Sequence, residues 1–162
     1  MSAVQTTITP EPTVGNEGAM YDSGSHHDIV TKIAQEDIPF GRYVRIVGDQ
    51  CELPDVTGEV TGRGGIAIKD SARPTGVGYK AGEPVAIMVT GRVWVRTEQA
   101  LAEGVQPFVR FAAGAGGGAA NVGMLRTDAD TATAVALPGA KMFRGTGAAA
   151  GLAVLELGRT GL

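Results

Sequence analysis

The chain has 162 residues and a mass of 16.5 kDa, a size that suits one domain, and 43% of its residues are hydrophobic. Its net charge of −3 comes without a concentrated run of basic residues, which excludes a general nucleic-acid-binding protein. Cys51 is the only cysteine, which excludes an intrachain disulfide, and no apolar run approaches the roughly 20 residues that cross a bilayer.

Residues 1–40 are predicted to form an extended N-terminal arm. They contain six acidic residues and one basic residue. Prolines, glycines, serines and threonines interrupt residues 1–27, and this composition alone cannot bury enough surface to fold. Two alternatives stand: the arm is disordered, or it orders against a neighbouring subunit. Its acidic side chains are either solvated or meet a basic protein surface, and Asp28–Ile33 is either a short strand or one helical turn.

A β-rich domain is predicted to follow, over residues 41–162. Pro39 holds the preceding residue in an extended conformation, and Gly41 allows the chain to turn. Tyr43–Val47 alternates as a strand does, with its first, third and fifth residues on one face. Ile66–Lys69 is a further short strand.

The stretch Val77–Thr97 is predicted to be the central hairpin of the domain. Two runs rich in β-branched residues, Val85–Val89 and Val93–Val95, flank a connection that contains Gly91. Trp94 is expected on the face opposite the neighbouring valines. No polar catalytic group lies in this stretch, so its role is architectural.

Further strands are predicted near the C-terminus, over Phe108–Phe111, Ala134–Leu137, Ala140–Phe143 and Gly151–Leu157. Short strands joined by glycine-rich connections are typical of small all-β domains. The predicted fold class is therefore mainly β: a small jelly-roll-like sandwich or barrel of about eight short strands, with an extended N-terminal arm.

The candidate metal ligands do not form a convincing set. His26 and His27 stand beside Asp28, but adjacent residues of an extended segment point to opposite sides, and the chain has no other histidine. Asp128 and Asp130 lack the further acidic residues of a calcium loop, so a turn held by Asx hydrogen bonds is favoured. No metal or cofactor is predicted.

No catalytic constellation is found either. Cys51 has no histidine partner with a third orienting group, and no serine lies in a Gly-x-Ser-x-Gly motif. The glycine-rich stretches lack the lysine of a phosphate-binding loop. Trp94 is either an exposed ligand platform or interface anchor, or a partly buried strand residue. The chain is therefore predicted not to be an enzyme.

Several short motifs, taken in order, resemble the structural cement (capsid decoration) proteins of tailed bacteriophages. They are Gly18–Asp22, Glu36–Arg42, Gly65–Ile68, Tyr79–Val85, Gly91–Val95, Ala134–Ala140 and Gly151–Leu157. The resemblance covers about residues 18–157, and it does not include the Ala/Gly-rich stretch 112–120.

This resemblance implies a β-rich protein on the outer surface of an icosahedral head, made in the host cytoplasm. The implied partners are the major capsid protein and further copies of the chain, with a trimer favoured over a dimer and no direct contact with nucleic acid or membrane. The alternative is a glycan-binding β-sandwich that uses Trp94 or Tyr79. The residues predicted to bind the partner are Met20, Tyr21, His26, His27, Ile38, Phe40 and Trp94.

Overall fold

The computed structural model describes residues 15–22, 26–74, 76–115 and 118–158, so the first 14 residues of the predicted arm lie outside the described part. Its elements in chain order are β1 (Asp28–Ala34), β2 (Tyr43–Val47), β3 (Gln50–Glu52), α1 (Thr57–Thr61), β4 (Gly64–Ala67), β5 (Pro84–Arg96), β6 (Phe108–Arg110), the 3-10 helix η1 (Ala119–Asn121), β7 (Leu125–Arg126), β8 (Ala134–Ala136), β9 (Ala140–Arg144) and β10 (Leu152–Leu157). The mainly β prediction is confirmed, with ten strands rather than about eight. No helix in the described ranges is long and apolar enough to span a membrane.

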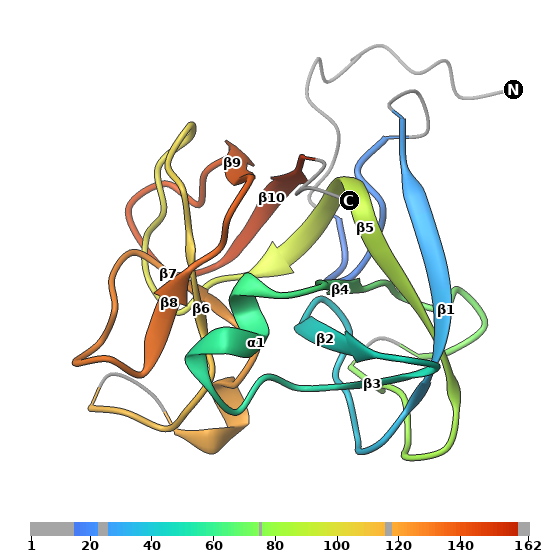
Figure 1. Cartoon of the computed structure of the whole chain (residues 1–162). Coiled ribbons are helices and arrows are strands. Elements are labelled where there is room, and N and C mark those ends of the chain that lie inside the picture. The colour runs from blue at the N-terminus through green and yellow to red at the C-terminus, as the bar shows by residue number, and fades with distance from the viewer. Residues whose placement is uncertain (1–14, 23–25, 75, 116–117, 159–162) are drawn as a thin grey trace, which may run out of the picture.

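Five strands close into a barrel in the order β1-β3-β2-β4-β5, because β1 pairs with both β3 and β5 (Figure 1). The stretch Asp28–Ala34 of the predicted arm is thus a strand of this barrel. Every barrel strand contributes to one buried cluster, which fills the interior. Its members are Ala34, Ile38, Phe40, Val44, Ile46, Cys51, Ala67, Tyr79, Val85 and Ile87.

The central stretch is one long strand, so the predicted hairpin is wrong. β5 runs for 13 residues from Pro84 to Arg96 without reversing direction. Its first half belongs to the barrel, and its second half pairs with β10, with Arg92 opposite Glu156. Gly91 has φ +129°, a conformation that side chains disfavour, and it lets β5 leave the barrel while keeping its pairing.

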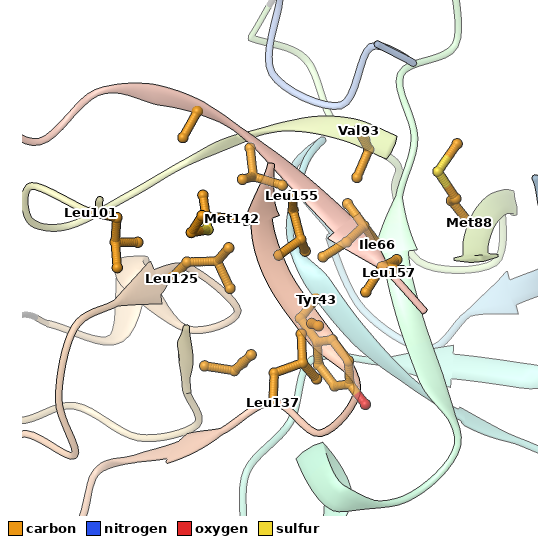
Figure 2. Packing of buried hydrophobic residues seen from close by; sticks show 14 of the residues in the cluster. Tyr43, Ile66, Met88, Val93, Leu101, Leu125, Leu137, Met142, Leu155 and Leu157 are labelled. Carbon is orange, nitrogen blue, oxygen red and sulfur yellow. The ribbon is translucent and has the colours of Figure 1, made fainter. Parts of the chain in front are cut away.

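A second core lies between the outer face of the barrel and the remaining strands (Figure 2). β10 pairs with β9, and β6 pairs with β7 and β8 in a separate three-stranded sheet. Tyr43 enters this second core while its neighbour Val44 enters the barrel, as their predicted alternation requires. Leu125, Met142 and Leu155 are each at most 1% exposed here, and burying such a side chain stabilises the fold by about 1.5–3 kcal/mol.

Candidate interaction surface

Residues 15–22, which we call the strap, lie along β5 as an added strand. The Gly18 N–H donates to the Trp94 carbonyl at 2.8 Å, and the Trp94 N–H donates to the Ala19 carbonyl at 2.8 Å. The Tyr21 N–H donates to the Arg92 carbonyl at 3.0 Å, and Met20 lies opposite Val93. The strap therefore continues along β5 from the stretch that β1 covers (Figure 1).

The strap is held by charge as well as by its backbone. Glu17 lies 3.2 Å from Arg96 and 3.8 Å from Arg42, and Asp22 lies 3.2 Å from Arg92. These acidic side chains therefore meet basic side chains of the same chain. These two ion-paired residues are therefore not part of a freely solvated tail.

An aromatic group anchors the C-terminal end of the strap. The Tyr21 ring lies 5.7 Å from that of Trp94 and 5.4 Å from that of Phe143, between centroids. The Arg92 guanidinium lies 3.7 Å from the centre of the Phe143 ring, and that of Arg144 lies 5.8 Å from the centre of the Trp94 ring. Aromatic and cation–π contacts of this kind add to the area that the side chains bury.

The N-terminal end of the strap fits closely against the same tryptophan. A Cβ atom at Gly15 would lie 2.3 Å from the Trp94 indole, so only glycine is accommodated there without a shift. Trp94 is 4% exposed, which overturns its interpretation as an exposed platform. Tyr79 is also 4% exposed, and its hydroxyl donates to the Ile68 carbonyl at 2.8 Å. Neither ring offers a face to a sugar.

The residues predicted to bind a partner divide into two groups. Met20 is 45% exposed, His26 and His27 are exposed, and Tyr21 is half-buried, all in or next to the strap. The others are buried in the chain: Ile38, Phe40 and Trp94. Phe40 supports the strap from below, since a Cβ at Gly18 would lie 3.0 Å from the Phe40 Cβ.

Sequence reasoning missed a group of charged residues, which we call the ionic cluster: Glu98, Arg110, Arg126, Asp128 and Asp130. Its side chains are buried except that of Asp128, which is 58% exposed. Arg110, with 0% of its side chain exposed, donates to both Glu98 oxygens at 2.5 and 2.7 Å and to Asp130 at 2.6 Å. Arg126 lies 2.9 Å from Glu98, 3.1 Å from Asp130 and 2.6 Å from Asp128. The cluster ties the three-stranded sheet to the segment that follows β5.

The ionic cluster also holds an unusual turn. Asp130, Thr131 and Ala132 have φ of 40°, 56° and 66°, in the left-handed region that L-residues disfavour. The predicted Asx hydrogen bond is present, because the Asp130 N–H donates to Asp128 Oδ1 at 3.1 Å. Both carboxylates bind arginines, and no group of three or more His, Cys, Asp or Glu residues in the described ranges is placed to hold a metal ion.

Comparison with known proteins identifies the family. The sequence model of the phage structural cement proteins (E217 gp24/Pam3 gp6) matches residues 4–158. The chain belongs to this family. A chain of the solved structure "The capsid of Myoviridae Phage XM1" has the same fold, with a TM-score of 0.68 and 14% identity over 98% of this chain and 99% of that chain. No curated protein matches the sequence.

Glu156 of this cement protein links β10 to the strap through Arg92. It accepts from Arg92 Nε at 2.7 Å and lies 3.1 Å from Lys141, and Arg92 also binds Asp22. The hydrogen bond from Arg92 lowers the pKa of the Glu156 carboxyl below its usual 4.5. This contribution to stability is therefore complete above about pH 4.5 and is lost as the pH falls through the lowered pKa.

We accordingly expect Glu156→Gln to weaken the dependence of stability on pH. Urea unfolding at pH 7, 5, 4 and 3 should show a smaller loss of unfolding free energy between pH 5 and 3 for the variant than for the parent, because the variant has no carboxylate to protonate. Glu103→Gln, at an exposed position, is the control and should keep the slope of the parent. Equal slopes for all three proteins would contradict a role for Glu156.

Proposed function

We propose that this cement protein binds the outer surface of an icosahedral phage head, bridges neighbouring major capsid subunits and stabilises the shell without enzymatic activity. The match of the family model over residues 4–158 carries the proposal. The fold shared with a chain of the phage XM1 capsid supports it. The protein would be made in the host cytoplasm and would act on the virion as a homo-oligomer, a trimer rather than a dimer.

The physical task of such a protein is to add buried area across the junctions between capsid subunits. Symmetry repeats one contact many times, so an interface that is modest in a single copy becomes strong over the whole shell. A barrel and an adjoining layer of strands, each with a buried core, suit this task, because a rigid body loses little conformational entropy when it docks.

We place the shell contact at the strap and the connection that follows it, in Met20, Tyr21, His26 and His27. Met20 exposes a large apolar side chain, and His26 and His27 are exposed as well. On the opposite face of the strand pair, the buried Trp94 fixes the position of Tyr21 and so holds the strap in place. An apolar side chain on a rigid base is the arrangement that interface anchors share. In this proposal the buried Ile38, Phe40 and Trp94 do not touch the shell but hold the contact residues in position.

A paired substitution tests this placement. Met20→Glu and Val77→Glu each put a charge on a large apolar residue of equal exposure, 45% and 44%. Heads assembled without this chain are mixed with each variant and sedimented. Met20→Glu should bind at least about fivefold more weakly than the parent, since an interface anchor contributes more than about 1 kcal/mol, whereas Val77→Glu should bind as the parent does.

Cryo-electron microscopy of the same heads with the parent protein tests the function itself. Density for the chain outside the major shell, bridging subunits, is the expected result. Absence of such density, together with no sedimentation of the parent chain with heads, would overturn the proposed function. Equal binding of both glutamate variants would overturn only the placement of the contact.

A further inference from the structure

We propose that the strap of one copy docks along β5 of a neighbouring copy, in the position that it occupies on its own β5. This exchange rests on the proposed function, since it needs copies held side by side on the shell. Its partner is a second copy of this chain, and its contact surface is the edge of β5 between Arg92 and Arg96 together with Arg42 and Phe143.

The first argument is that this edge recognises the strap specifically. Backbone hydrogen bonds would accept any extended segment, but the side-chain contacts would not. Glu17 and Asp22 meet arginines at either end, and Tyr21 fits between Trp94 and Phe143. Gly15 is required where the indole leaves no room for a Cβ. The segment that fits is residues 15–22, whichever copy supplies it.

The second argument is the length of chain between the strap and the barrel. Tyr21 bonds to Arg92, and Asp28 lies opposite Thr90, only two residues away on β5. Six peptide units nevertheless join Asp22 to Asp28. An extended chain spans up to about 3.6 Å per residue, so this connection can reach about 20 Å. Two residues of β5 span only about 7 Å, so the connection is longer than this step along one β5 requires. It would let the strap dock on the β5 of another copy that lies within about 20 Å.

The third argument is a pair that the strap does not complete on its own β5. Glu17 Oε1 and Arg42 Nε lie 3.8 Å apart, and neither has a hydrogen-bond partner among the described residues. Buried polar atoms are normally paired. On a neighbouring copy the strap is still joined to its own β1, but that β1 no longer lies on the same β5. The strap can therefore shift by the fraction of an ångström that closes this pair.

Exchange replaces contacts within a copy by the same contacts between copies. Its only new cost is therefore the loss of freedom on association. Copies fixed side by side on a shell present their straps to one another at a high effective concentration, which offsets this cost. Each exchanged strap would then join two cement proteins directly.

A disulfide trap tests the exchange. Met20 and Val93 lie opposite each other at a pair flanked by hydrogen bonds, the type of antiparallel pair whose Cα atoms are about 4.5 Å apart and can be bridged. Two single variants, Met20→Cys and Val93→Cys, are mixed and added to heads assembled without the protein. The sample is oxidised, the heads are sedimented, and the bound protein is run on a non-reducing gel. Val93 is 0% exposed beneath its own strap, and the native Cys51 is also 0% exposed.

A disulfide-linked dimer of the two variants in the sedimented fraction is the expected result. A mixture of Met20→Cys and Val56→Cys chains measures the disulfides that form by chance encounter. Val56 is 52% exposed, yet its cysteine should form fewer disulfides with Met20→Cys than the buried Val93→Cys does. A chain that carries both Met20→Cys and Val93→Cys should form this disulfide whether or not the straps exchange. It therefore shows that the fold tolerates both cysteines. Sedimentation of the mixture without an interchain bond overturns the exchange and leaves the proposed function standing. Failure of the parent chain, which carries neither substitution, to sediment with heads overturns both proposals.

Discussion

Replacing Arg110 by alanine is expected to lower the free energy of unfolding by about 3–5 kcal/mol, the usual effect of breaking a buried ion pair. The Arg110 side chain is 0% exposed, and it donates to Glu98 and Asp130, which are 3% and 9% exposed. The alanine variant leaves two carboxylates in a buried site with only Arg126 to compensate them. It also removes a support of the left-handed turn at Asp130–Ala132, whose conformation disfavours the folded state.

An ion pair of the same length at the surface provides the control. Lys80 Nζ lies 2.6 Å from Asp37, as Arg110 does from Asp130, but both side chains are more than 60% exposed. Lys80→Ala should change stability little, because solvent screens such a pair. Denaturant unfolding followed by circular dichroism measures both variants. Similar losses for the two would show that burial does not decide the strength of the ionic cluster.

Replacing Gly91 by valine is expected to cost about 3 kcal/mol or more. A β-branched side chain is strained at φ +129°, by about 1–3 kcal/mol. Its Cβ would also lie 2.9 Å from the Cβ of His27 and 3.0 Å from the sulfur of Met88, and overpacking of this kind costs about 1–3 kcal/mol. Both effects act where β5 passes from the barrel to its pairing with β10.

Gly82→Val separates these two effects. Gly82 has φ +84°, but a Cβ there meets no atom within 4 Å. Its valine variant should therefore show only the backbone strain and lose less stability than the Gly91 variant, in the same denaturant experiment. Equal losses would mean that the close contacts of a side chain at position 91 with His27 and Met88 contribute nothing.

Local sequence patterns predicted where the strands lie. The path of the chain between two apolar runs is decided instead by pairing with segments that are distant in the sequence. Tyr43–Val47 has its predicted bounds and faces because alternation along one strand is a local property. Gly91 between two apolar runs is equally compatible with a hairpin and a bend. The bend is selected by β1 and β10, which lie some 60 residues before and after it in the sequence and pair with the two halves of β5.

The candidate site was predictable only in part, for the same reason. Met20 and Tyr21 are predicted as contact residues because the arm carries large apolar side chains at intervals, and the structure shows only that they lie in the strap. The ionic cluster was missed because a charged residue in a short strand, such as Arg110, is normally expected to face solvent. Only the pairing of β6 with β7 brings Arg110 beside Arg126 and buries both against Glu98.

The direction of the strap gives the cement protein a mechanical property. Its hydrogen bonds to β5 are perpendicular to the strands, as in any antiparallel pair. A pull along the axis of β5 on the chain before Gly15 therefore loads these hydrogen bonds together in shear and does not peel them apart one at a time. Because β1 continues along the same strand, the tension passes directly into the barrel wall. A load on the chain before the strap would thus be shared by the hydrogen bonds between the strap and β5 before one of them breaks.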